Sequence, residues 1–336
     1  MPPRIAAEPL LSICIPTYNF GSFIGATLDS ILSQVTDERV EIVVVDGGST
    51  DETEGLMREL AALHPEISYH RLPQKGGIDA DMALSVELAR GRYGWLFSAD
   101  DIVLPGALDR VLSSLEPGVD VHLVETILCR FDLTPIRYQQ NLTSRDAETF
   151  DLTDAGVRAR YFGLAANTQA FFSFCGAVIV DRRRWIETAA DERFMGSCWG
   201  HVARIFRMMP RGLRVRHLPW PASWKRGDND SFQQQGLLRR IRIGIDGYLR
   251  IAEEFFGLES AEAAGIRRCL RAEYTFPYLL WARLQCDARE LAALYARVHP
   301  PRVALLAIRF APTPLLRTAY TLLSGLRKVR RGFAGG

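Results

Sequence analysis

Short apolar runs alternate with stretches of helical periodicity through the first hundred residues, and this alternation limits the possible folds more than any other feature of the sequence. Residues 41–45 form a continuous β-branched run, which is typical of a parallel strand buried on both faces. We expect three more strands at 10–15, 67–72 and 93–97, and helices at 20–32, 50–63 and 79–89. Because short strands that alternate with helices form βαβ units, the sequence predicts an α/β fold with a mostly parallel sheet.

The alternation weakens after Pro105, and the later part of the chain is predicted to be organised differently. Residues 119–128 and 177–180 have the apolar pattern of further strands, and the polar stretch 141–160 between them is predicted to be irregular. From residue 233 onward the periodicity is helical, over 237–256, 261–282 and 289–298. The sequence therefore predicts an α/β domain over residues 1–235 and a helical region over residues 236–336 that ends in a basic amphipathic tail.

The composition argues for a globular protein that does not cross a membrane. Of the 336 residues, 48% are hydrophobic and 24% are charged, which is ordinary for a globular chain. No apolar run approaches the roughly 20 residues needed to span a bilayer, and the first nine residues lack the apolar core of a secretory signal. The six cysteines are scattered without a CxxC pair, so we expect no disulfide framework and a reducing cytoplasm.

Positive charge is concentrated at the C-terminal end of the chain. Glu290 is the last acidic residue and eight Lys or Arg residues follow it, although the net charge of the whole chain is only +2. Residues 303–331 interleave arginines with leucines, a pattern found in basic amphipathic helices that lie on anionic membrane surfaces. The alternative is a helix packed on the protein with a solvated basic face. Nucleic acid is not expected as a partner, because no recognised nucleic-acid module accompanies this charge.

Acidic residues follow two of the predicted strands. Asp46 follows the strand at 41–45, and Asp100 and Asp101 follow the strand at 93–97. Open α/β sheets bind ligands at the carboxyl ends of their strands, so the two clusters indicate a shared ligand site. Adjacent carboxylates repel each other without a counterion, and a divalent cation shared with a diphosphate would supply one. A metal-chelated sugar nucleotide fits both clusters, whereas either cluster considered alone also fits a solvated turn or a helix cap.

A further loop offers groups that suit a nucleotide. Pro16 ends the first predicted strand, and Thr17, Tyr18 and Asn19 follow it with hydroxyl, aromatic and amide groups. Gly47, directly after Asp46 in the second strand's loop, lets a ligand approach the backbone. A plain strand-to-turn transition explains the first loop equally well when it is considered alone.

In their order and spacing, these motifs resemble those of the family 2 glycosyltransferases, which have the GT-A fold. The resemblance rests on SICIPTYN, on VVVDGGSTDET, and on the aromatic strand GRYGWLF with the acidic motif after it. It covers residues 10–110 strongly and residues 170–232 weakly. It implies a Rossmann-like, mostly parallel sheet flanked by helices, and an enzyme that moves a sugar from a nucleoside-diphosphate donor to a hydroxyl with inversion.

The resemblance also implies roles for residues at the matching positions. The donor-binding residues would be Pro16, Thr17, Tyr18, Asn19, Asp46, Gly47, Asp100, Lys225 and Arg226. Asp46 would hold the base, and Asp100 and Asp101 would bind a divalent metal, Mg²⁺ or Mn²⁺. Ser98 stands where many relatives have an Asp, so metal binding would rest on these two aspartates.

The position of the general base departs from the family's pattern. The family places an acidic residue before a helix that ends in Arg, and His201 occupies that position here. A neutral histidine can take a proton from an acceptor hydroxyl, whereas the alternative is a packed or capping histidine beside Trp199. Asp191 and Glu192, slightly upstream, are the competing candidates for the base.

The charged loop after residue 223 makes the chain resemble one subgroup of the family in particular. Lys225 and Arg226 would neutralise the departing diphosphate, and with His201 they make the chain similar to the abequosyltransferase-like subgroup of bacterial surface-polysaccharide enzymes, which act on O-antigen-like or capsule glycans. The implied partners are a nucleotide-sugar donor and a glycan or polyprenyl-linked glycan acceptor, at the inner face of the cell membrane.

Two other functions stay open from the sequence. One is a nucleotidyltransferase that makes the sugar nucleotide, although the chain has no Gly-rich loop followed by Arg and Pro near its N-terminus. The other is a catalytically inactive subunit that binds a nucleotide sugar or a glycan, which Ser98 and His201 leave open because each replaces an acidic residue.

Overall fold

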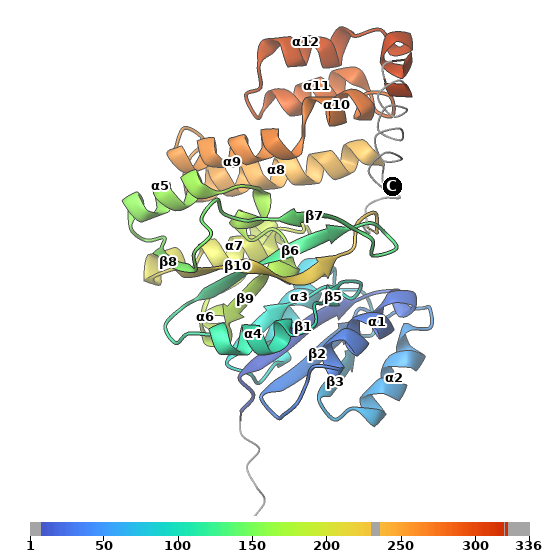
Figure 1. The fold of residues 1–336 in the computed structure, drawn as a ribbon, viewed down its shortest axis with the longest axis vertical. Coiled ribbons are helices and arrows are strands. Elements are labelled where there is room, and N and C mark those ends of the chain that lie inside the picture. The colour runs from blue at the N-terminus through green and yellow to red at the C-terminus, as the bar shows by residue number, and fades with distance from the viewer. Residues whose placement is uncertain (1–7, 230–235, 319, 322–336) are drawn as a thin grey trace, which may run out of the picture. The chain divides into compact units, whose positions relative to one another are not determined.

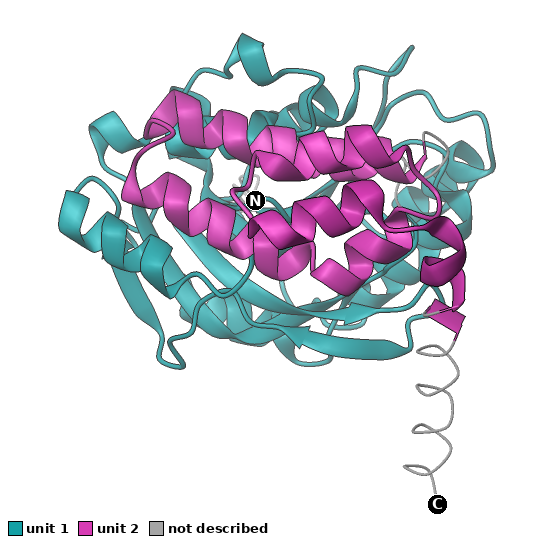
Figure 2. Ribbon diagram, turned by 90° about the horizontal axis from the view of Figure 1, so that it is seen from above, with its two compact units in different colours: residues 1–229 teal, residues 230–336 magenta. Residues whose placement is uncertain are grey.

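The computed structural model describes residues 8–229, 236–318 and 320–321. The chain divides into two compact units, residues 1–229 and 230–336, which Figure 2 colours separately. The first unit is an α/β structure and the second is helical over its described residues.

The first unit is built on one mixed sheet, in which the four N-terminal strands are parallel (Figure 1). These strands are β1 (Leu11–Thr17), β2 (Val40–Asp46), β3 (Ile67–Arg71) and β4 (Tyr93–Leu96). They alternate with α1 (Gly21–Leu32), α2 (Thr53–Leu63) and α3 (Ile78–Leu88). All seven residues of β2 are buried, as the continuous apolar run predicts for a strand covered on both faces. The predicted α/β fold with a mostly parallel order in this region is confirmed.

The sheet continues with strands from the later part of the unit, in the order β3-β2-β1-β4-β9-β6-β10-β5. The added strands are β5 (Ile102–Val103), β6 (Val121–Cys129), β9 (Val178–Asp181) and β10 (Arg214–Lys225). Two short strands pair at the side, β7 (Pro135–Gln139) on β6 and β8 (Glu148–Asp151) on β10. β9 runs antiparallel to both of its neighbours, β4 and β6, which makes the sheet mixed.

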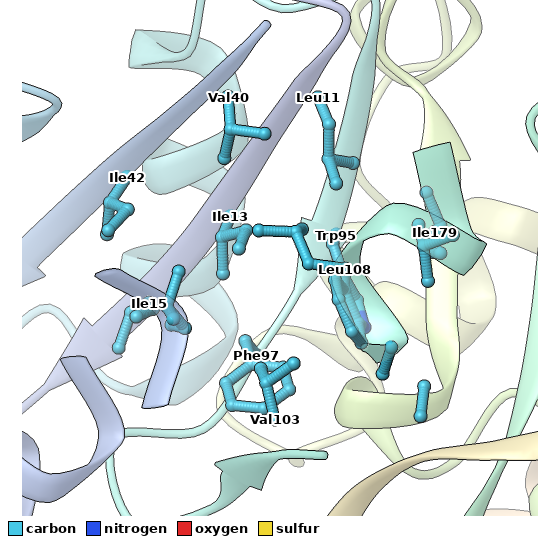
Figure 3. Close-up of a cluster of buried hydrophobic side chains, with 14 of the residues drawn as sticks. Leu11, Ile13, Ile15, Val40, Ile42, Trp95, Phe97, Val103, Leu108 and Ile179 are labelled. Atoms are coloured by element: carbon cyan, nitrogen blue, oxygen red, sulfur yellow. The ribbon is translucent and has the colours of Figure 1, made fainter. Parts of the chain in front are cut away.

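The core lies between the parallel strands and the helices that cover them (Figure 3). Ile13 of β1, Trp95 of β4 and Leu108 of α4 (Ala107–Ser114) meet there, each with no exposed surface. Complete burial of an apolar side chain of this size stabilises the fold by about 1.5–3 kcal/mol. The packed core holds the strand ends in fixed positions, and the acidic loops start from those ends.

Two segments of this unit, 148–164 and 214–225, have structure that was not expected from the sequence. Part of the stretch predicted to be irregular forms β8 and α5 (Ala155–Leu164). Asp154 stabilises the start of α5, because its side chain accepts the backbone N–H of Val157. β10 continues through Pro219 and Pro221 with two register irregularities, although proline normally breaks a central strand. The remaining elements of the unit are α6 (Arg182–Glu187), α7 (Gly200–Phe206) and the 3-10 helices η1 (Thr168–Phe171), η2 (Cys175–Ala177), η3 (Glu192–Phe194) and η4 (Met209–Arg211).

The second unit contains α8 (Leu237–Phe255), α9 (Ala261–Glu273), α10 (Phe276–Ala282), α11 (Ala288–Ala296) and α12 (Arg302–Phe310). The single helix expected over 261–282 is divided in two, because Pro277 lies in the first turn of α10 and cannot continue a preceding helix. Within the described residues, no helix is long and apolar enough to cross a bilayer. Residues 319 and 322–331 of the predicted basic tail lie outside the described residues.

Candidate functional site

The two loops that follow β1 and β2 are joined by hydrogen bonds. Thr17 and Asp46 are register partners at the ends of these strands. The backbone N–H of Asn19 donates to Ser49 Oγ, and Asn19 Oδ1 accepts the backbone N–H of Thr50, both at 2.8 Å. Asn19 adopts a positive φ of 57°, which asparagine tolerates better than most residues. Asn19 therefore fixes the shape of the loop that carries Tyr18.

Asp46 is completely buried and fully engaged. Its Oδ1 accepts the backbone N–H and the hydroxyl of Ser49, at 2.8 and 2.7 Å. Its Oδ2 accepts the hydroxyl of Tyr69 at 2.6 Å and lies 3.9 Å from the guanidinium of Arg71. These bonds hold the loop after β2 in place, and they leave the carboxylate no exposed surface for a ligand.

Asp100 and Asp101 follow β4 and behave differently from Asp46. Asp100 accepts hydrogen bonds from Ser98 Oγ at 2.5 Å and from Asn229 Nδ2 at 2.8 Å. Asp101 Oδ1 accepts the backbone N–H of Arg226 at 2.8 Å, whereas its Oδ2 is buried and has no hydrogen-bond partner in the part of the chain that the structure describes. Burial, and then the charge of Asp100, raise the pKa of Asp101 well above its usual range.

The residues around Asp101 fit a divalent cation held in part by a substrate. The described residues contain no group of three or more His, Cys, Asp or Glu side chains that would enclose a metal by themselves. Mg²⁺ in particular is bound by one or two carboxylates together with substrate phosphates. The bare Oδ2 of Asp101 has the chemistry of such a ligand, because an unpaired buried carboxylate oxygen is costly until a cation or a donor approaches it.

Two basic residues lie beside the acidic pair. The ammonium of Lys225 lies 4.1 Å from the centre of the Phe174 ring, and its charge lowers the pKa of Asp101. Arg226 donates from Nε to the backbone carbonyl of Asp100 at 2.9 Å. Arg226 therefore fixes the loop that carries the aspartates, while Lys225 presents its charge at the edge of the same site.

His201 lies in the first turn of α7. Its Nε2 is 3.0 Å from the backbone carbonyl of Phe172, and since a carbonyl only accepts, Nε2 carries the proton. Burial lowers the pKa of His201, although the charge of Asp79 acts in the opposite direction. Phe172 has a positive φ of 64°, which is strained for a bulky residue. The Phe172 carbonyl thus fixes the orientation of the ring, and burial favours the neutral form, in which Nδ1 can accept a proton.

Asp191 is committed to other contacts. It caps η3 by accepting the backbone N–H of Arg193 at 3.2 Å, and the Arg193 guanidinium lies 2.7 Å from its Oδ2. Arg207 lies 3.7 Å from the same oxygen. The hydrogen bond from Arg193 holds the pKa of Asp191 below its usual value, which makes its carboxylate a weak proton acceptor.

A short segment connects the acidic pair with the histidine. Residues 172–176 begin at the carbonyl that holds His201 and end at Gly176, where an added Cβ would lie 3.6 Å from Asp101 Oδ2. Trp95 Nε1 of β4 donates to the Gly176 carbonyl at 3.0 Å and fixes this segment to the sheet. One short segment of the chain therefore contacts both Asp101 and His201.

Three residues of this region were missed by the sequence analysis. Asp79 and Asp81 lie in the first turn of α3, and Lys75 lies in the loop before it. Asp79 and Asp81 are both buried, and the Lys75 ammonium lies 3.9 Å from the centre of the Tyr18 ring. Acidic residues in a first helical turn usually interact with the helix dipole at the surface, so the pattern gave no reason to place them in a site.

The sequence is similar to those of known glycosyltransferases. The family model described as glycosyl transferase family 2 matches residues 12–179. The chain is 28% identical over 298 residues to the abequosyltransferase RfbV of Salmonella typhimurium, covering 86% of this chain and 89% of that protein. It is 34% identical to the chondroitin synthase of Escherichia coli over 119 residues, which are 35% of this chain and 17% of that protein.

Solved structures show the same fold at low sequence identity. The S. aureus TarS 1–349 complex with UDP-GlcNAc has a TM-score of 0.56 at 15% identity, covering 89% of each chain. The mannosyltransferase PcManGT of Pyrobaculum calidifontis, in complex with GDP-Man and Mn²⁺, has a TM-score of 0.55 at 16% identity, covering 95% of this chain and 80% of that one.

Proposed function

The chain belongs to glycosyltransferase family 2, with the GT-A fold that its motifs resemble, and we propose that it transfers a sugar with inversion from a nucleoside-diphosphate donor to a hydroxyl of a glycan or lipid-linked glycan. The observation that carries this proposal is the bare, buried Oδ2 of Asp101 after β4, together with the segment 172–176 that contacts both this aspartate and His201 of α7. The proposed site thus combines a place for a charged leaving group with a proton acceptor.

In this proposal the donor lies across the ends of β1, β2 and β4. Tyr18 offers its ring to the nucleoside, and Asp100 and Lys225 lie toward the ribose and the diphosphate. Asp101 holds the divalent cation, Mg²⁺ or Mn²⁺, which neutralises the negative charge of the diphosphate when it is bound. Lys225 adds positive charge where the leaving group gains negative charge, so it stabilises the transition state more than the ground state.

His201 acts as the general base on the acceptor. Because Nε2–H is held by the Phe172 carbonyl, Nδ1 is the nitrogen that takes the hydroxyl proton while the oxygen forms its bond to the sugar carbon. Bond formation to the oxygen and departure of the diphosphate occur on opposite faces of that carbon, which inverts its configuration. Asp191 is less suited to this role, because two arginines already bind its carboxylate.

We further propose that the acceptor belongs to a bacterial surface polysaccharide, such as an O-antigen-like or capsular glycan. Similarity to an abequosyltransferase over most of both chains supports this assignment. An acceptor on a polyprenyl lipid would place the enzyme at the inner, cytoplasmic face of the membrane, where nucleotide sugars are also present. The described part of the tail agrees with such a location, because Val303, Leu306 and Phe310 of α12 are exposed beside Arg309.

Donor hydrolysis separates this proposal from its alternatives. Purified protein with Mn²⁺ is expected to release nucleoside diphosphate slowly from one nucleotide sugar of a panel of UDP, GDP, CDP and dTDP sugars, and Asp101→Asn is expected to stop the release. Binding of a donor without release would favour an inactive binding subunit, and exchange that depends on pyrophosphate would favour a nucleotidyltransferase. The exposed Asp109→Asn on α4 is the matched control.

Membrane association is tested with lipid vesicles. The wild-type chain is expected to sediment with vesicles rich in phosphatidylglycerol and not with phosphatidylcholine vesicles, and added salt is expected to weaken the binding. Leu306→Ser combined with Phe310→Ser removes exposed apolar surface and is expected to reduce sedimentation. Equal sedimentation of the wild-type chain and the double variant would show that α12 does not bind the membrane.

A further inference from the structure

A cavity rich in arginine lies at the start of β4, at the opposite end of this strand from Asp100 and Asp101. Its volume is about 600 Å³, the size of cavities that hold small ligands. Five guanidinium groups line it, those of Arg90, Arg92, Arg182, Arg183 and Arg184. The cavity lies outside the proposed donor site, and the proposed function does not use it.

Two of the five arginines are bound to buried carboxylates. Arg184 Nε donates to Asp120 Oδ1 at 2.7 Å, and Arg90 Nε donates to Glu41 Oε2 at 2.9 Å. Asp181, a further acid of the lining, accepts the backbone N–H of Arg184 at 3.0 Å. The charges of Arg90 and Arg184 are therefore compensated within the fold.

Arg92 and Arg182 have no such compensation. The guanidinium carbon of Arg92 lies 5.3 Å from the centre of the Tyr93 ring, and its side chain forms no hydrogen bond or ion pair among the described residues. Arg182 donates from Nε to the backbone carbonyl of Val86 at 3.2 Å and from Nη2 to that of Glu87 at 3.4 Å. Because both carbonyls are neutral, the charge of Arg182 has no carboxylate partner in the part of the chain that the structure describes.

The same two arginines are neighbours across the sheet. The backbone N–H of Arg182 donates to the carbonyl of Arg92 at 2.9 Å, one position beyond the register pair of Tyr93 and Asp181 on the antiparallel strands β4 and β9. Side chains at opposite positions of such strands lie on one face, and like charges there repel each other. An anion between the two guanidinium groups would remove this repulsion.

We propose that the cavity binds a phosphate group between Arg92 and Arg182, either of a free phosphate compound or of a phospholipid headgroup. Guanidinium groups bind phosphate oxygens through paired, charge-assisted hydrogen bonds. Arg183 adds positive charge, because its pair with Glu187 joins side chains that are 82% and 44% exposed and is therefore weak. Glu8, the remaining acid of the lining, is exposed, so salt screens its charge.

Calorimetric titration with inorganic pyrophosphate, without metal and at constant ionic strength, tests the site. We expect the wild type to bind, and Arg92→Ala to bind about 10- to 100-fold more weakly, as for the loss of a charge-assisted hydrogen bond. Arg92→Lys keeps the charge without the paired hydrogen bonds and should give an intermediate affinity. Arg145→Ala, at an exposed position outside the lining, is the matched control. Lys225→Ala should also retain the binding, because Lys225 belongs to the proposed donor site.

Vesicles of phosphatidic acid distinguish the two sources of phosphate. The variant with Leu306→Ser and Phe310→Ser serves as the background, so that α12 contributes little. If the phosphate belongs to a headgroup, adding Arg92→Ala reduces sedimentation of this background. If it belongs to a free compound, sedimentation does not change and the wild type binds pyrophosphate.

The proposal is overturned if Arg92→Ala equals its parent protein in both pyrophosphate affinity and sedimentation, or if the wild type binds neither probe. Because Arg92 is exposed, its replacement should leave the melting temperature of the free protein unchanged. A loss of binding in Lys225→Ala that equals the loss in Arg92→Ala would also overturn it, since pyrophosphate would then occupy the donor site.

Discussion

The carboxylate of Asp79 accepts the backbone N–H of Gly200 at 2.9 Å, although 121 residues separate them in the sequence. The other oxygen of Asp79 accepts the N–H of Cys198, also at 2.9 Å. The first turn of α3 is thereby bonded to the start of α7, the helix that carries His201. Because Asp81 lies in the same turn and beside Gly47, the start of α3 contacts both the loop after β2 and the helix that carries His201.

Loss of the Asp79 carboxylate is expected to disturb His201 without removing the donor site. Asp79→Ala leaves two backbone N–H groups unpaired, which costs about 1–3 kcal/mol of stability for each buried group. We expect kcat for transfer to fall at least tenfold, while KM for the donor changes less than threefold. Steady-state kinetics at saturating acceptor measure both values. An unchanged kcat in a variant with a lower melting temperature would show that the contact supports only the fold.

Replacement of His201 is expected to remove the base with little effect on donor binding. His201→Ala should lower kcat by about 10²- to 10⁴-fold, the usual contribution of a positioned base. Burial lowers the pKa of His201, so the neutral, active form persists below pH 6.5 and activity falls only at more acidic pH. The residual activity of His201→Ala should not show this fall at acidic pH. An identical pH profile in both proteins would show that another residue is the general base. Asp191→Asn would then be the next variant to measure.

The parallel half of the sheet could be predicted from the sequence, because continuous apolar runs and helical periodicity are local signals. The positions of Asp100 and Asp101 at a strand end followed from the same signals. The burial of Asp79 and Asp81 could not be predicted, because it depends on Gly200 and Gly47, whose proximity arises only after the sheet has formed. β8 was missed because its residues are mostly polar and its pairing partner in β10 lies about sixty residues later.

Asp101→Asn is expected to abolish the metal dependence of donor binding. A ligand that binds only the folded state raises the melting temperature, so Mn²⁺ together with the preferred nucleoside diphosphate should stabilise the wild type more than the nucleotide alone. In Asp101→Asn this additional shift should disappear, although the amide oxygen can still accept the Arg226 N–H. Asp109→Asn should retain the shift. A full Mn²⁺-dependent shift in Asp101→Asn would exclude Asp101 as the metal ligand.

Tyr69→Phe tests whether Asp46 binds the nucleobase or only holds the loop after β2. The Tyr69 hydroxyl donates to Asp46 Oδ2 at 2.6 Å, so its removal leaves a buried carboxylate oxygen with one donor fewer and should cost about 1–3 kcal/mol of unfolding free energy. Urea denaturation measures this loss, and Tyr320→Phe, at an exposed position, is the matched control. If Asp46 only holds the loop, the ratios of nucleotide affinities stay as in the wild type. A change in base preference in Tyr69→Phe would instead show that Asp46 contacts the nucleobase, as the family resemblance implies.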